Sequence, residues 1–128
     1  DGVQAFDPYG LVRQAALWGV GAKAVLQRVL VARAFTCHQL VRLAKERLPR
    51  VLGPGTLVVL LGPVSLFYDD QVPLTERRRL FGELLQALAA AKARAPLLIL
   101  QPPRPRGAAN CHFGRHLWKL VEVVAHCR

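Results

Sequence analysis

Cysteine and histidine side chains near the C-terminal end of the chain have the residue types of a zinc site. Cys111-His112 and His116 are followed further on by His126-Cys127, and Cys and His are the usual zinc ligands. Their spacing contains no CxxC pair, and His112 and His116 alone are spaced as an HxxxH pair. If Leu117–Val124 forms a strand, as we expect, its two ends lie about 25 Å apart and separate the two groups. We therefore predict no metal site here.

Two other pairs of residues invite a chemical interpretation. Cys37-His38 has the types of a nucleophile and its base, but adjacent helical side chains point about 100° apart. The sequence also places no orienting acid nearby, so we expect a half-buried thiol beside a His in the cap region. Asp69-Asp70 offers two carboxylates without a third ligand, which is more typical of a turn. We predict no catalytic residue and no cofactor in this chain.

The elements that would position such residues alternate between helix and strand. Asp7 and Pro8 are an N-cap and first-position pair that opens a helix ending at Gly19. The patterns that follow predict a short helix, a strand and a longer helix, at Ala22–Gln27, Val29–Ala32 and Thr36–Leu48.

The second half of the chain continues this alternation. Thr56–Leu61 is a continuous apolar run bounded by glycine, typical of a central parallel strand covered on both faces. We then expect a loop, a long helix, a strand, a second loop and a last strand, at Gly62–Pro73, Thr75–Arg94, Pro96–Leu100, Gln101–His112 and Leu117–Val124. Trp118 on this last strand is expected to be a packing residue, as is Trp18 in the first helix. The order predicts one α/β domain over residues 1–128, with a mostly parallel β-sheet flanked by helices.

One segment resembles a known family closely. In Val31–Leu40, with the sequence VARAFTCHQL, an expected strand ends in ARAF and a helix with a His-Gln pair follows, as in RadA-type recombinases. Asp1–Leu11 is similar to the family's strand end followed by F-x-P-x-x-L, and Leu57–Leu61 falls where its Walker B strand lies. The resemblance to the RecA/RadA family covers most of the 128 residues. It implies a RecA-like core lacking the first strand and the P-loop.

The catalytic positions of that family carry other residues here. Leu61, or Gly62 after a shift of one residue, occupies the place of the Walker B acid that holds Mg²⁺. Val3 occupies the place of the catalytic Glu, and Gln101 that of the polar sensor. The sequence also contains no P-loop motif of the form Gly-x-x-x-x-Gly-Lys-Ser/Thr. The resemblance therefore implies a degenerate, non-catalytic paralogue.

The chain begins at Asp1 and contains no Met, so we expect residues upstream of it. A P-loop there would make the protein an ATPase that binds ATP and Mg²⁺, which is one alternative. Another alternative is a protein-interaction module whose basic charge has no function. Three Cys without framework spacing indicate a reducing compartment, and we expect a cytoplasmic protein. No apolar run reaches the ~20 residues of a membrane span, so we expect no membrane partner.

Basic residues dominate the charge of the chain. Lys and Arg number 18 against 8 Asp and Glu, a formal net charge of +10, which favours polyanionic partners. By resemblance, two loops would face DNA, and the first, Tyr68–Val72, is short and acidic. The second contains Arg104 and Arg106. We predict that these two Arg contact DNA, more readily single-stranded DNA, together with three residues that follow them: Arg115, His116 and Lys119.

The three consecutive arginines Arg77, Arg78 and Arg79 are expected at the start of the long helix. They would spread around much of its circumference rather than form one flat patch. We interpret them as a solvated face. A core without its first strand leaves an apolar sheet edge open, and we expect either upstream residues or a contact with a second copy of the chain to cover it. A recombinase is the other protein partner that we expect.

Overall fold

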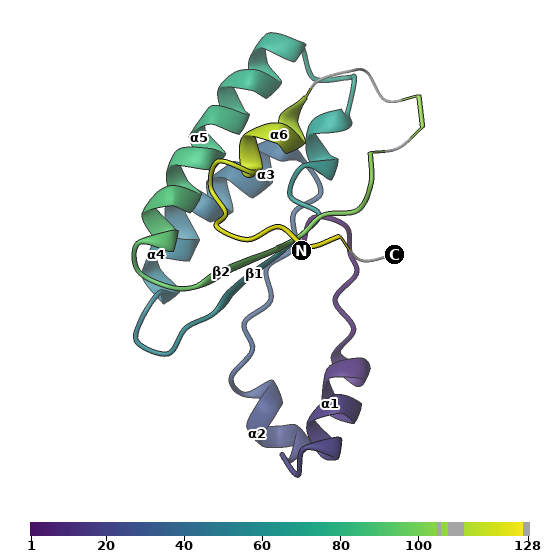
Figure 1. Ribbon diagram of the computed structural model, residues 1–128, viewed down its shortest axis with the longest axis vertical. Coiled ribbons are helices and arrows are strands. Elements are labelled where there is room, and N and C mark those ends of the chain that lie inside the picture. The colour runs from purple at the N-terminus through teal and green to yellow at the C-terminus, as the bar shows by residue number, and fades with distance from the viewer. Residues whose placement is uncertain (105, 108–111, 127–128) are drawn as a thin grey trace.

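The computed structural model describes residues 1–104, 106–107 and 112–126. It combines helices with a small parallel sheet of two strands (Figure 1). In chain order the elements are α1 (Pro8–Leu17), α2 (Ala22–Leu26), α3 (Cys37–Arg42), a π-helical segment (Leu43–Arg47), α4 (Leu48–Val51), β1 (Val58–Leu61), a 3₁₀ turn (Ser65–Tyr68), α5 (Leu74–Lys92), β2 (Leu97–Leu100) and α6 (Phe113–Leu117).

The sheet pairs β1 with β2 in parallel, with Val58 opposite Leu97 and Leu61 opposite Leu100. Parallel neighbours need a crossover connection, and α5 supplies it. Figure 1 shows the two strands almost edge-on, with α3 to α6 on one side and the α1–α2 pair, at the end of two extended segments, on the other. The expected strands Thr56–Leu61 and Pro96–Leu100 and the flanking helices are thus confirmed in their coarse form.

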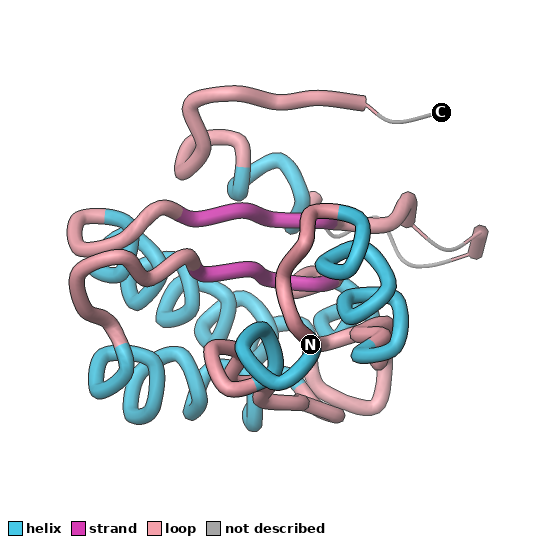
Figure 2. The backbone as a smooth tube through the Cα atoms, turned by 90° about the horizontal axis from the view of Figure 1, so that it is seen from below, coloured by secondary structure: helices cyan, strands magenta, loops and turns pink. Residues whose placement is uncertain are grey.

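Only one face of this sheet is covered. Along β2, Leu97 and Ile99 pack against the core, whereas Leu98 and Leu100 are exposed, and Val59 of β1 is exposed as well. Figure 2 is seen from the side of this open face, with the helical body from α3 to α6 beyond the strands and the α1–α2 pair nearer the viewer. The expectation of a strand buried on both faces was therefore wrong in this chain, because no described helix packs on the second face.

The helix expected at Thr36–Leu48 is present but changes register. Thr36 caps it, with Gln39 N donating to Thr36 Oγ1 at 3.2 Å, and the turn from Leu43 to Arg47 is π-helical. Pro49 explains the change, since proline has no N–H and its ring clashes with the carbonyl of the preceding turn. The Pro49 carbonyl instead accepts from Arg94 Nη1 at 3.1 Å, which ties this stretch to the end of α5.

An aromatic cluster centres the core between the helices. Phe67 meets Phe81 edge-on at 4.9 Å between ring centroids, and Phe113 of α6 lies 4.9 Å from Phe81. Leu84 and Leu88 of α5 are fully buried against the same cluster. The edge-to-face pair contributes about 0.5–1.5 kcal/mol beyond the area it buries, and Phe113, whose ring is tilted by 48° against that of Phe81 and buried, packs α6 against α5.

Two expected strands are absent. Val29–Ala32 is extended but forms no ladder, and Leu30 and Val31 are exposed. Its backbone hydrogen bonds join Val29 N to Leu26 O at 3.3 Å and the Asp1 ammonium to Ala32 O at 2.7 Å, so the segment lacks the continuous partner that a strand needs. Leu117–Val124 also contains no strand, because Phe113 and Leu117, one helical turn apart, both enter the core and fold the start of this stretch as α6.

The α1–α2 pair stands apart from the body. Asp7 caps α1 as expected, with Tyr9 N donating to Asp7 Oδ1 at 2.9 Å. Ala15 is buried, but Trp18 is 81 % exposed, so the prediction that Trp18 packs in a core was wrong. In the described part of the chain, no helix is both long and apolar enough to cross a membrane.

Candidate nucleic-acid interface

The carboxyl ends of β1 and β2 are tied together by Gln101. Gly62 N donates to Leu100 O at 2.7 Å, directly after the two strands. Gln101 Oε1 accepts from Val64 N at 2.9 Å, and Gln101 Nε2 donates to Ser65 Oγ at 3.2 Å. One amide side chain therefore holds the segment after β1 against the segment after β2. It lies at the start of the basic loop that carries Arg104 and Arg106.

The four degenerate positions of the family resemblance lie together at this sheet end. Gly2 N donates to Leu61 O at 2.8 Å, which places Val3 beside β1. Gly62 has a φ of +60°, and a Cβ built on it would lie 2.1 Å from Val3 Cγ1. Val3 thus fills the space beside Gly62. With Leu61 and Gln101, the group offers one amide and no carboxylate, so it lacks the donors that Mg²⁺ prefers.

The predicted DNA-contacting residues form two groups. Arg104 and Arg106 are exposed on the loop after β2, while Arg115 and His116 lie on α6 and Lys119 in the turn after it, all three exposed (Figure 1). Pro105, expected to hold the two loop arginines apart, is outside the described residues, as are Cys111 and Cys127 of the zinc hypothesis. Within the described ranges, no three His, Cys, Asp or Glu side chains gather closely enough to hold a metal ion.

Acidic side chains are mostly engaged with cations already. Six of the eight form ion pairs: Asp1, Asp7, Glu46, Glu76, Glu83 and Glu122. Asp69 and Asp70 are exposed in the loop before α5. Since most of the negative charge is neutralised in pairs, the remaining cations face solvent with little local compensation. This arrangement raises the positive potential around the exposed basic residues.

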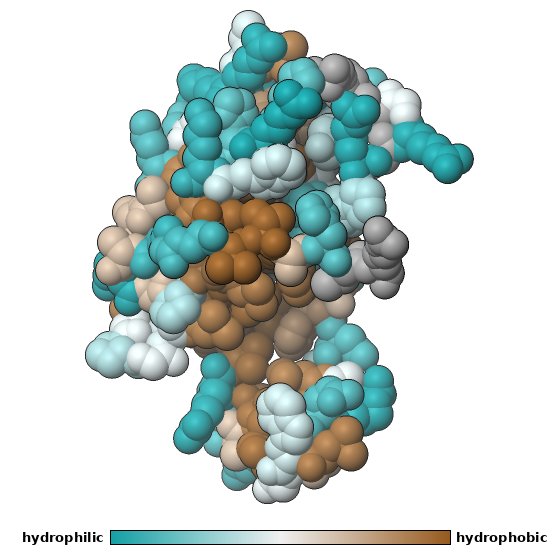
Figure 3. All heavy atoms as spheres, viewed as in Figure 1, coloured by the Kyte–Doolittle hydropathy of each residue, from teal (hydrophilic) through white to brown (hydrophobic). Residues whose placement is uncertain are grey.

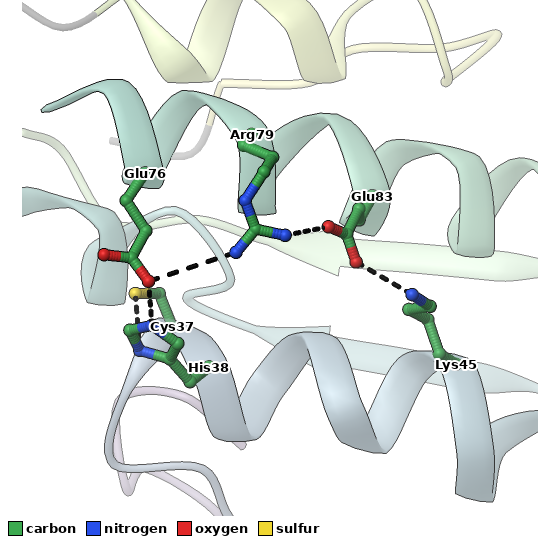
Figure 4. Close-up of polar contacts among 6 residues, drawn as sticks. All are labelled: Cys37, His38, Lys45, Glu76, Arg79 and Glu83. Atoms are coloured by element: carbon green, nitrogen blue, oxygen red, sulfur yellow. Dashed lines mark hydrogen bonds and ion pairs between the residues drawn. The ribbon is translucent and has the colours of Figure 1, made fainter.

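Cys37, His38 and Glu76 form a chain of polar contacts between α3 and α5 (Figure 4). Cys37 Sγ lies 3.7 Å from His38 Nδ1, and His38 Nε2 lies 2.8 Å from Glu76 Oε1. The expectation that no acid lies near this pair was wrong, because α5 brings Glu76 from far along the sequence. However, Cys37 is only 1 % exposed, and burial raises the pKa of its thiol. A buried, protonated thiol is a poor nucleophile.

A second set of charges in Figure 4 joins the same two helices. Glu83 of α5 accepts from Lys45 Nζ at 2.8 Å and pairs with Arg79. The hydrogen bond from Lys45 is the main cause that holds the pKa of Glu83 below its usual value. These contacts position α3 and its continuation against α5, and we assign them a structural role.

The arginine run at the start of α5 is not one solvated face. Arg77 is only 6 % exposed, and its Nη1 donates to Phe67 O at 3.0 Å. Arg78 is exposed, and Arg79 pairs with Glu76 and Glu83. The prediction was therefore wrong for Arg77, which anchors the 3₁₀ turn before α5. Three consecutive arginines gave no sign of this in the sequence, since only the packing of Phe67 decides it.

Trp118 is the feature of this region that sequence reasoning missed. It caps the C-terminal end of α6 and is 60 % exposed, not packed in a strand. Phe113 and Leu117 carry a signal that could have revealed this, because their helical spacing places Trp118 away from the buried side.

The chain matches no family model, and no curated protein matches it.

Proposed function

We propose that this protein binds DNA without turning over nucleotide, as a degenerate RecA/RadA-like protein that assists recombination or repair. The observation that carries the proposal is the pairing of charges: most carboxylates are neutralised, while Arg106, Arg115 and Lys119 are exposed and have no carboxylate partner among the described residues. Exposed cations of this kind bind phosphates with little regard to sequence. Single-stranded DNA is the expected form.

The family resemblance supports the absence of turnover. The positions of the Walker B acid and of the catalytic Glu correspond to Leu61 or Gly62 and to Val3, and these apolar groups contact one another at the end of β1. A RecA-like core downstream of its P-loop would place a helix–sheet layer and a basic loop in this order. A recombinase or a second copy of the chain would then be the protein partner.

The test is the binding of fluorescein-labelled oligo(dT) by fluorescence anisotropy across a salt series. The four cations among the predicted contacts, Arg104, Arg106, Arg115 and Lys119, predict a slope of log affinity against log salt of about −2.8, and the double variant Arg104→Ala/Arg106→Ala should reduce it to about −1.4. The matched control is Arg47→Ala/Arg50→Ala, which removes the same charge from exposed sites in the Leu43–Val51 helical stretch. No binding at low salt, or equal losses in both double variants, would contradict the proposal.

A protein-binding surface is the second candidate, and the exposed area favours it. The chain exposes 9128 Å², whereas a compact monomer of 14.1 kDa exposes roughly 6,700 Å². The excess of roughly 2,400 Å² is in the range of stable protein interfaces. Figure 3 shows apolar residues gathered over the middle of the molecule, at the level of the strands. Nucleic-acid binding that is absent or insensitive to salt would favour this candidate.

A further inference from the structure

Trp118 stands exposed among cations on the outer side of α6. Tryptophan is the side chain with the most apolar area to bury, and it is enriched where one molecule contacts another. Here 60 % of its surface remains in solvent. The residue is not at a frayed end, because its backbone keeps helical angles (φ −61°, ψ −27°) and Leu120 N donates to Leu117 O at 2.9 Å in the next turn.

The helix fixes the order of side chains around this outer side. Phe113 and Leu117 define the buried direction. At about 100° per residue, counted from Phe113, Trp118 lies at about 140°, Arg115 at about 200° and His116 at about 300°. Arg115 therefore lies between two aromatic rings, and Lys119 follows Trp118 in the turn after α6. The nearest carboxylate in sequence, Glu122, is engaged with Lys92 Nζ at 3.1 Å.

A shallow hollow continues this surface beyond His116. It has a volume of about 270 Å³, lies between α5 and the turn after α6, and has Lys119 on its lining. Most of its remaining lining is apolar, from Leu85, Ala89 and Leu120. An apolar hollow beside an ammonium group has the chemistry to take an apolar base face next to a phosphate.

We propose that the outer side of α6 is a stacking platform for single-stranded nucleic acid, with Trp118 stacking on a base and Arg115 and Lys119 contacting the flanking phosphates. This inference rests on the proposed function and adds the residue that gives it its preference for single strands. Single-strand binders combine a cationic track with aromatic rings that accept the face of any base. Bases in a duplex are already stacked, and unstacking one costs a few kcal/mol, so duplex DNA should bind more weakly.

The test uses the intrinsic fluorescence of Trp118 in the full chain. Trp18 is replaced by Phe, so that Trp118 is the one remaining tryptophan. Oligo(dT) of about 20 nucleotides should quench the emission, and an abasic oligonucleotide of the same length should bind but leave the emission unchanged. Vesicles of equal parts phosphatidylcholine and phosphatidylserine, and polyglutamate, should also leave it unchanged. An equal response to either of these probes would overturn the proposal.

Anisotropy with labelled oligo(dT) tests the stacking platform separately from the proposed DNA binding. Trp118→Ala should weaken binding about 5- to 150-fold without changing the salt slope, Trp118→Phe should keep most of the affinity, and Lys119→Ala should reduce the slope. Because Trp118 is exposed, circular dichroism should show all three variants folded. If oligo(dT) binds but Trp118→Ala has no effect, the stacking platform is wrong and DNA binding stands. If oligo(dT) does not bind at all, the proposed function itself fails.

Discussion

Replacing Gly62 by alanine should destabilise the protein strongly, and the cause can be separated into two parts. The backbone at Gly62 has a φ of +60°, a left-handed conformation that costs a residue with a Cβ about 1–2 kcal/mol. The added Cβ would also lie 2.1 Å from Val3 Cγ1, and relieving such overpacking costs about 1–3 kcal/mol. We therefore expect Gly62→Ala to lower the free energy of unfolding by about 2–5 kcal/mol.

A double-mutant cycle tests this division. Val3→Ala removes the atoms that collide, at a cost of about 1 kcal/mol for the lost burial. The double variant should then be more stable than the sum of the single changes by about 1–3 kcal/mol, leaving the backbone cost in place. Urea unfolding followed by circular dichroism measures all four proteins. A loss below about 0.5 kcal/mol for Gly62→Ala, or strict additivity with Val3→Ala, would refute the reasoning.

Two further predictions concern the start and the middle of α5. Arg77→Ala should lower stability by about 1–3 kcal/mol, because the buried carbonyl of Phe67 loses its donor, while Arg78→Ala should change it by less than about 0.5 kcal/mol; similar losses in urea unfolding would contradict this. The lowered pKa of Glu83 contributes stability that is present above the unfolded-state pKa and lost as the pH falls through the folded-state value. Lys45→Met should therefore reduce the loss of stability at acidic pH, measured as the free energy of unfolding against pH. An unchanged dependence on pH would contradict the role of the Lys45 hydrogen bond.

Local signals in the sequence predicted the elements whose causes are local. Asp7 and Thr36 cap helices because their side chains reach backbone N–H groups two or three residues away. The apolar runs that became β1 and β2 also needed no distant information. By contrast, the sequence around these strands did not reveal that one face of the sheet stays open, because that depends on which helices pack against the sheet.

The errors arose where distant contacts decide the outcome. Val29–Ala32 has a strand composition but meets little beyond Asp1. Arg77 is buried because the 3₁₀ turn at Phe67 folds over it. Glu76 reaches His38 across 38 residues of sequence, a distance at which spacing carries no information. Leu117–Val124 has a β-like composition, but its first residue is held in α6 by the helical spacing of the buried Phe113 and Leu117, and the residues after it form a turn and coil.

The fit between Val3 and Gly62 also bears on the proposed absence of turnover. A carboxylate introduced at position 62 would meet the same Cγ atoms that exclude alanine, and aspartate tolerates a positive φ only somewhat better. Restoring an acid there would therefore require a change at Val3 as well. Neither change would alter the exposed cations of α6 or the ring of Trp118, which belong to a separate segment of the chain. A protein can thus keep a nucleic-acid surface of this kind while partly buried side chains without a carboxylate fill the sheet end, and that independence is what makes binding without turnover a coherent proposal for this chain.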